Sequence, residues 1–167
     1  MDYRRRRAEK TPPRELPREE QIRQAKLKAL RLLERMDRTE AQLREKLMQA
    51  EFEPEATEQA VAYVKSFGYV NDERYVRNYI ECRREQKSRR QIEQELLYKK
   101  GVPKDLIRQV YEELEPADER ELIRRFLEKK HYCGASADEK KKRSVMASLA
   151  RKGFSAEDIL AVMREEQ

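Results

Sequence analysis

Residues 39–47 read TEAQLREKL, and residues 88–96 repeat the pattern as SRRQIEQEL. Each stretch opens with a hydroxyl residue suited to a helix N-cap, and a glutamine three positions later completes a capping box. Two apolar residues four positions apart follow in both stretches, Leu43/Leu47 and Ile92/Leu96. This spacing places each pair on one face of a helix. The sequence therefore predicts two equivalent capped helices within an internal repeat.

Further helices flank each capped helix. In the first copy, a helical stripe of Leu27, Leu30 and Leu33 precedes the capped helix. A helix opened by Pro54 follows it, and the apolar face of that helix is predicted to extend to Phe67, before Gly68 ends it. The capped helix thus belongs to a unit of three helices.

The unit occurs three times. The position of Leu43 recurs 49 residues later at Ile92 and a further 53 residues later at Val145. The longer second step indicates an insertion at residues 131–139, where Ser136 and Glu139 form a third possible capping box. Periods of this length are typical of stacked helical repeats.

The predicted fold is all-α, with three tandem three-helix repeats that share a continuous core and form an elongated, curved body. The predicted divisions are a disordered basic arm at residues 1–20, then repeats at 21–70, 71–116 and 117–167. A single irregular helical bundle is the alternative.

Composition excludes several classes of protein. The 167 residues are 43% charged and 38% hydrophobic, carry a net charge of +6, and include one histidine and two cysteines. Two cysteines are too few for a disulfide framework, and two cysteines with one histidine are too few for a multi-ligand zinc module. No apolar run approaches the roughly 18 residues of a membrane span. We expect a cytoplasmic protein without a membrane segment or cofactor.

Enzyme motifs are missing from the sequence. It has no glycine-rich phosphate loop, nucleophile elbow or paired-histidine metal motif. His131 is the single histidine; Cys133, two residues away, would point elsewhere on a helix, and Cys82 belongs to another repeat. We expect a non-enzymatic protein with no catalytic residue.

Two basic runs are the candidate binding residues. The first lies at the turn before the second capped helix, where free N–H groups of the helix start add positive potential. It consists of Arg83, Arg84, Lys87, Arg89 and Arg90. The second, in the third repeat, consists of Lys140, Lys141, Lys142 and Arg143. Both runs are expected to be exposed, and ordinary solvated charge is the alternative reading.

Four tyrosines, Tyr63, Tyr69, Tyr75 and Tyr79, could form a stacking platform for single-stranded bases. Tyr63 and Tyr79 lie near apolar helical positions, so packing is the favoured role for them.

Several of these motifs resemble a known family. Residues 68–75, GYVNDERY, are similar to the signature of RecX, the bacterial regulator of the RecA recombinase. Residues 91–96 followed by 99–102, QIEQEL and KKGV, are similar to the middle repeat of that family, and residues 39–47 and 152–154 also match. Many members carry a Gly- and Pro-bearing turn where this chain has Lys87-Ser88-Arg89.

The resemblance implies a non-enzymatic protein that binds in the groove of the RecA filament on single-stranded DNA. We expect a monomer. The resemblance also implies restraint of filament extension, ATP hydrolysis, strand exchange and RecA-stimulated repressor cleavage. The two basic runs would then contact RecA or DNA. The rival hypothesis is a stand-alone DNA-binding protein that uses its three-helix units like helix-turn-helix domains.

Overall fold

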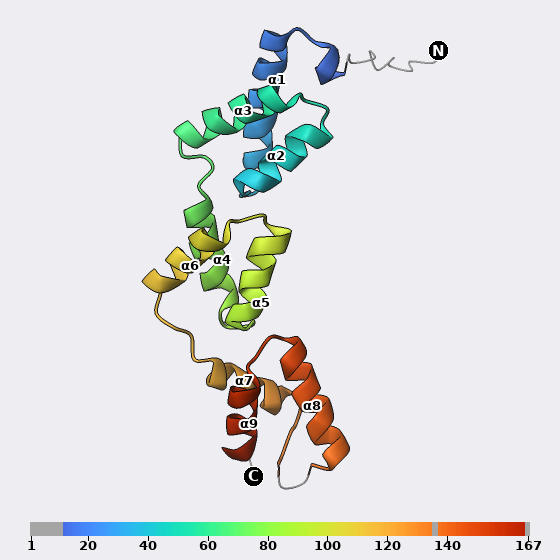
Figure 1. Ribbon diagram of the computed structural model, residues 1–167, viewed down its shortest axis with the longest axis vertical. Helices are drawn as coiled ribbons and strands as arrows, with labels where there is room; N and C mark the ends of the chain where they lie inside the picture. The colour runs from blue at the N-terminus through green and yellow to red at the C-terminus, as the bar shows by residue number, and fades with distance from the viewer. Residues whose placement is uncertain (1–11, 135–136, 166–167) are drawn as a thin grey trace, which may run out of the picture. The chain divides into compact units, whose positions relative to one another are not determined.

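The computed structural model describes residues 12–134 and 137–165. Over these residues it contains helices and no strand, which confirms the predicted all-α class. In chain order the elements are the 3-10 turn η1 (Pro13–Glu15), α1 (Arg18–Leu33), α2 (Glu40–Gln49), α3 (Pro54–Ser66), α4 (Asp72–Arg83), α5 (Arg89–Gln94), the π-helical turn η2 (Glu95–Lys99), α6 (Lys104–Glu113), α7 (Glu119–Lys129), α8 (Glu139–Arg151) and α9 (Ala156–Glu165) (Figure 1).

The chain divides into two compact units, Met1–Asp72 and Glu73–Gln167. Its buried apolar side chains form three separate clusters, within residues 25–70, 76–110 and 122–163. Each cluster belongs to one predicted repeat, so the prediction of a continuous core is wrong. In the second unit, polar contacts join the two repeats where a continuous core would need apolar packing. One example is the hydrogen bond from Ser88 to Lys152.

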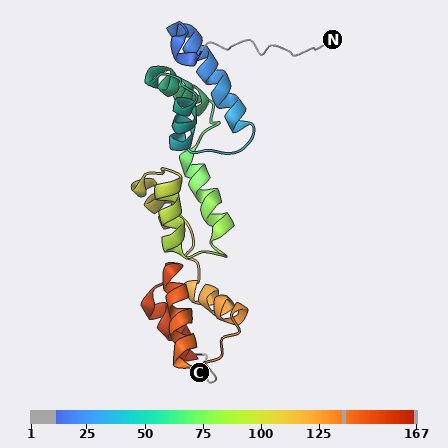
Figure 2. The same cartoon turned by 90° about the vertical axis from the view of Figure 1, so that its right-hand side faces the viewer.

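The first unit packs α1 against α3, with α2 beside both (Figure 2). Ala25 and Ala29 are fully buried on α1, whereas Leu27 is 45% exposed. The predicted leucine stripe is therefore wrong at Leu27, although Leu30 and Leu33 do pack against the core. The two alanines have little side-chain bulk, so this face of α1 can lie close to its neighbours.

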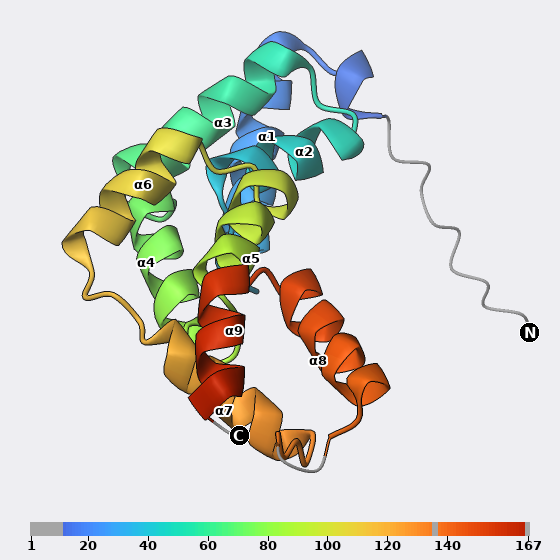
Figure 3. The same cartoon turned by 60° about the horizontal axis from the view of Figure 1, so that its bottom comes forward.

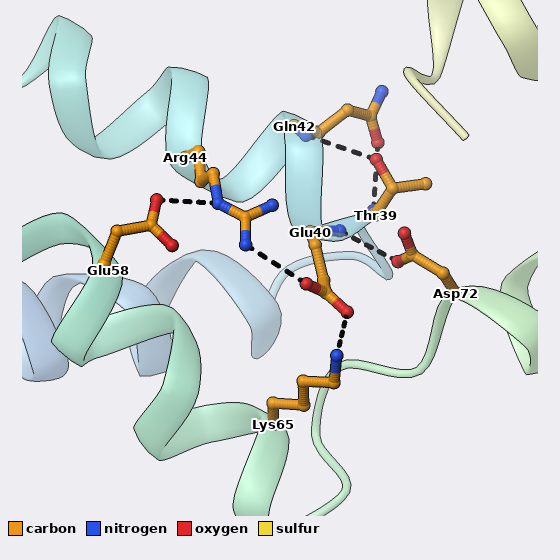
Figure 4. A network of polar contacts seen from close by, with 7 residues as sticks. All are labelled: Thr39, Glu40, Gln42, Arg44, Glu58, Lys65 and Asp72. Atoms are coloured by element: carbon orange, nitrogen blue, oxygen red, sulfur yellow. Dashed lines mark hydrogen bonds and ion pairs between the residues drawn. The ribbon is translucent and has the colours of Figure 1, made fainter. Parts of the chain in front are cut away.

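Polar contacts fix the start of α2 (Figure 4). Thr39 and Gln42 form the predicted capping box: the Gln42 N–H donates to Thr39 Oγ1 at 3.2 Å, and the Thr39 N–H donates to Gln42 Oε1 at 3.3 Å. Asp72 accepts a further hydrogen bond from the Glu40 N–H at 2.8 Å. Burial alone would raise the pKa of Glu40, but its ion pairs with Lys65 and Arg44 lower that pKa. The helix start is thereby held by side chains both inside and outside α2.

The first helix begins earlier than predicted. The structure describes η1 and the first turn of α1 within the predicted arm, so helix starts at Arg18 rather than near Gln21. Pro17 is the N-cap, with φ of −54°. Glu19 and Glu20 lie in the first turn, where their negative charges stabilise the helix by interacting with the positive end of its dipole. Residues 1–11 of the predicted arm lie outside the described residues.

The second repeat consists of α4, α5 with η2, and α6. Ile92 and Leu96 are buried as predicted, against Val76, Ile80 and Val110. The π-helical turn η2 buries Glu95 as well as Leu96, although the two are adjacent in sequence. This repeat therefore contains one carboxylate within its apolar surroundings.

The third repeat packs α9 against α7 and α8, and Figure 3 shows α8 leading into α9. Asp118 caps α7 by accepting from the Glu121 N–H, and Asp138 caps α8 by accepting from the Lys141 N–H. The predicted cap Ser136 lies outside the described residues, and the N-cap that the structure shows for α8 is Asp138.

Candidate functional site

The basic turn, defined as Arg83, Arg84, Lys87, Arg89 and Arg90, joins α4 to α5. Its backbone is ordered by hydrogen bonds from the Arg84 N–H to the Ile80 carbonyl at 2.8 Å and from the Lys87 N–H to the Arg83 carbonyl at 3.0 Å. Figure 1 shows this turn next to the turn between α8 and α9 of the same unit. The five side chains therefore project from a fixed piece of backbone.

Ser88 anchors the basic turn from two sides. Its side chain is fully buried and accepts from the Gln91 N–H at 3.2 Å, which confirms the predicted N-cap of α5. The Gln91 side chain does not return a hydrogen bond to the Ser88 N–H, so the predicted capping box is formed only by half. The Ser88 hydroxyl also donates to the Lys152 carbonyl at 2.6 Å. One serine thus caps α5 and joins the second repeat to the third.

Lys87 is directed into the protein and not into solvent. Its ammonium contacts both carboxylate oxygens of Glu95, at 2.6 and 2.7 Å, and its side chain is 24% exposed. Burial alone would raise the pKa of Glu95, but hydrogen bonds from Lys87 and Tyr79 lower it. The prediction that Lys87 is an exposed charge is therefore wrong, because a buried carboxylate needs a partner.

Arg89 is exposed but already engaged. Its guanidinium pairs with Glu93 at 2.7 Å and lies 4.4 Å from the ring centroid of Tyr111. Its backbone N–H donates to Glu119 at 2.6 Å. A ligand would have to compete with these contacts.

The remaining three residues of the basic turn, Arg83, Arg84 and Arg90, are named here the open arginines. Within the described part of the chain, none of them has a carboxylate at ion-pair distance. Arg84 donates to the Glu115 carbonyl at 3.1 Å, and Arg83 lies 5.8 Å from the ring centroid of Tyr79. Arg90 is exposed on the first turn of α5. These three charges are the ones available to an anionic partner.

The second basic run lies on the first turn of α8. Lys141 donates to the His131 carbonyl at 3.0 Å, and Lys142 pairs with Glu139 at 3.5 Å. Lys140 and Arg143 are exposed. Because an α-helix rises 1.5 Å per residue, this run lies roughly 17 Å along α8 from the contact that Lys152 makes with Ser88. The two runs are therefore distinct patches, and their role in binding stays a prediction.

The four predicted tyrosines separate into two groups. Tyr75 and Tyr79 are half-buried and stacked, with ring centroids 6.1 Å apart. The Tyr79 hydroxyl donates to Glu95 at 2.8 Å, and burial together with this hydrogen bond raises the pKa of Tyr79 to about 12. The packing role predicted for Tyr79 is confirmed.

Tyr63 and Tyr69 form an exposed aromatic cluster with Phe67, at the end of α3. The exposed fractions are 36% for Tyr63, 61% for Phe67 and 54% for Tyr69. The ring of Phe67 lies 5.0 Å from that of Tyr63 and 6.1 Å from that of Tyr69, and the Lys26 ammonium lies 4.8 Å from the Tyr63 centroid. The predictions that Phe67 lines the core and that Tyr63 packs are therefore wrong.

Gly68 explains the aromatic cluster. Its φ of +71° is left-handed, and the Tyr69 N–H donates back to the Val64 carbonyl at 3.0 Å. Helix α3 ends at Ser66, so Phe67 no longer follows the buried face. The glycine was the sequence signal for the position of Tyr69, because a left-handed residue reverses the chain after Phe67.

Other kinds of site find no support among the described residues. Their histidine, cysteine and acidic side chains form no group that could hold a metal ion. None of their helices is both long enough and apolar enough to cross a bilayer. Cys82 and Cys133 are exposed and are not joined in a disulfide.

Family models give the decisive comparison. The first, second and third three-helix domains of RecX match residues 25–63, 71–110 and 118–163, in chain order. The chain belongs to the RecX family. The predicted resemblance is confirmed, as is the organisation into three three-helix repeats.

Individual RecX proteins agree with this assignment. Regulatory protein RecX of Caldanaerobacter subterraneus subsp. tengcongensis is 39% identical over 141 residues, covering 83% of this chain and 68% of that protein. Regulatory protein RecX of Trichlorobacter lovleyi is 40% identical over 137 residues, covering 78% of this chain and 88% of that protein. The crystal structure of RecX from Lactobacillus salivarius has the same fold, with a TM-score of 0.68 and 18% identity over 86% of this chain and 95% of that one.

Proposed function

We propose that this protein is a non-enzymatic modulator, mainly an inhibitor, of the RecA recombinase in the cytoplasm. It binds in the groove of the RecA filament on single-stranded DNA and restrains strand exchange, ATP hydrolysis and RecA-stimulated repressor cleavage. Membership of the RecX family supports this proposal, and the curated relatives are named regulatory proteins. The mechanism is occupancy, because a protein lying in the groove excludes duplex DNA and other proteins.

The open arginines are the observation that carries the proposal. Their charges lack carboxylate partners among the described residues, while the backbone that presents them is anchored by Ser88. A fixed cationic surface loses little conformational freedom on binding, so its contacts add to affinity. Phosphates or acidic side chains of the filament are the matching partners.

Reversal of two open arginines, Arg84→Glu with Arg90→Glu, is expected to weaken inhibition of DNA-dependent ATP hydrolysis by RecA at least tenfold at low salt. The melting temperature should change little, because exposed charges such as Arg90 contribute about 0–1 kcal/mol each and the half-buried Arg84 has no ion pair to lose. Each lost phosphate contact should also flatten the salt dependence by a slope of roughly 0.7.

The control is Arg35→Glu with Arg164→Glu, which makes the same change of net charge at two exposed residues outside the basic turn. Inhibition should be measured across a salt titration for both pairs. Equal inhibition by the parent and the Arg84/Arg90 variant at every salt concentration would mean that the basic turn is only a solvated surface.

The aromatic cluster supports direct contact with single-stranded DNA. Exposed aromatic rings stack with unpaired bases, and each stacked base contributes about 1–3 kcal/mol to binding. Phe67→Ala with Tyr69→Ala should therefore weaken binding to a single-stranded oligonucleotide about tenfold or more. Stability should be nearly unchanged, because both rings are more than half exposed.

Binding of the parent and the double variant can be followed by the anisotropy of a labelled oligonucleotide. Because the chain has no tryptophan, quenching of intrinsic tyrosine fluorescence is a second measurement for the Phe67→Ala single variant, which retains Tyr69. The matched control is Met48→Ala, another exposed apolar side chain of the first unit. If the double variant binds the oligonucleotide with unchanged affinity, the aromatic cluster does not contact single-stranded DNA. Tight, sequence-dependent binding of duplex DNA without RecA would instead favour the stand-alone DNA-binding hypothesis.

A further inference from the structure

A cavity of about 330 Å³ lies beside the basic turn in the second unit. Ile80 and Ile92 contribute to its apolar lining, together with Leu114, Pro116 and Ala117 from the segment between α6 and α7. Arg84 and Arg89 also line it. This volume is at the small end of the range for ligand pockets and accommodates one large apolar side chain.

The lining disfavours a nucleobase as the occupant. The aliphatic residues offer no hydrogen bonds to the ring nitrogens and amino groups of a base, which would be costly to bury unpaired. One face of the aromatic ring in the lining, that of Tyr111, is already covered by the Arg89 guanidinium at 4.4 Å. Burial raises the pKa of Tyr111, whose hydroxyl has no hydrogen-bond partner in the described structure. An aliphatic or aromatic protein side chain fits these surroundings better.

The charge beside the cavity favours an acidic segment. The Arg84 guanidinium donates to a main-chain carbonyl, that of Glu115, and no described carboxylate pairs with it. Two carboxylates, those of Glu115 and Glu119, also line the cavity, but neither pairs with Arg84. Glu119, the first residue of α7, already accepts from the Arg89 N–H at 2.6 Å. A carboxylate next to an inserted apolar side chain would therefore meet an arginine that has no ion-pair partner.

We propose that this cavity receives one apolar side chain from an acidic surface segment of RecA, with Arg84 pairing to the carboxylate beside it. The inference rests on the proposed function and assigns this side of the basic turn to RecA and not to DNA. Buried apolar anchors ringed by charged contacts typically carry most of the affinity of an interface.

Ala117→Trp tests the proposal, because Ala117 is exposed and lines the cavity without belonging to the core. The indole should fill the space and weaken binding to RecA filaments at least tenfold, while binding to the single-stranded oligonucleotide alone stays unchanged. The matched control is Ala147→Trp, which adds the same side chain at an exposed alanine of α8 and should bind like the parent.

Two variants of opposite charge at the same position test the proposal without depending on how a large side chain packs. Ala117→Asp should weaken filament binding by repelling the acidic segment, and Ala117→Lys should preserve or strengthen it. Combining Ala117→Trp with Arg84→Glu should cost less than the sum of the two single effects, because both remove the same contact. Each variant is compared with the parent by co-sedimentation with RecA filaments and by a melting curve.

The outcomes distinguish the cavity from the proposed function. Parent-like filament binding by Ala117→Trp and by Ala117→Asp overturns the cavity proposal and leaves the proposed function standing. If Ala117→Trp weakens binding to the filament and to the oligonucleotide equally, the occupant of the cavity is a nucleic acid. That result also overturns the cavity proposal. If the parent itself fails to bind RecA filaments, the proposed function fails, and the cavity proposal with it.

Discussion

Lys87→Glu is expected to lower the free energy of unfolding by about 3 kcal/mol, the lower end of the range for breaking a buried ion pair. The substitution removes the partner of Glu95, which is 8% exposed, and places a second carboxylate beside it. The lower end applies because Lys87 is 24% exposed and because Lys99 remains 3.6 Å from Glu95. Urea unfolding at neutral pH, followed by far-UV circular dichroism, measures the effect.

The control is Arg90→Glu, which makes the same charge change three residues away. Arg90 is an open arginine, so its variant should remain within about 0.5 kcal/mol of the parent. The exchange Lys87→Glu with Glu95→Lys should recover part of the lost stability, because it restores an ion pair. Equal stability of the two single variants would contradict a buried pair at Lys87 and Glu95.

This difference affects how the basic turn should be mutated. A reversal of the complete turn would combine lost binding with partial unfolding, since Lys87 supports the second repeat from within. The open arginines can be changed without that effect, which is why the functional test uses Arg84 and Arg90.

Gly153→Ala is expected to cost about 2–3 kcal/mol. Its φ is +90°, so alanine must adopt a left-handed conformation, at about 1–2 kcal/mol. A Cβ at this position would also lie 2.7 Å from Ser88 Oγ, which must then move. Displacing that hydroxyl weakens its hydrogen bond to the Lys152 carbonyl, worth about 1 kcal/mol.

The matched control is Gly68→Ala. Gly68 has a φ of +71°, but a Cβ there meets nothing within 4 Å. The two variants share the backbone cost, so the difference between their unfolding free energies isolates the contact with Ser88. Ser88→Ala combined with Gly153→Ala should add little to Ser88→Ala beyond the backbone cost. Equal losses in Gly68→Ala and Gly153→Ala would show that the repeats are not joined at this point.

The candidate site could be predicted only in part. The run of basic residues was evident, and the N-cap at Ser88 located it at a helix start. The sequence could not separate Lys87 from Arg90, since both are basic residues next to the same cap. Their environments differ because η2 turns Glu95 inward toward Lys87, whereas no described carboxylate lies within ion-pair distance of Arg90. The cavity was missed because Pro116 and Ala117 lie in the segment between α6 and α7, where no helical pattern indicates which side chains come together.

The helices, the three repeats and the family could all be predicted from the sequence alone. Caps such as Thr39 with Gln42, and apolar pairs such as Leu43 with Leu47, act between residues three or four positions apart, so they can be read directly from the chain. Which charges lack ion-pair partners, and how the last two repeats join, could be learned only from the folded protein. Those features depend on partners distant in sequence, and Ser88 meets Lys152 across 64 residues. Local spacing cannot show such a contact, because it exists only after both repeats have folded and docked.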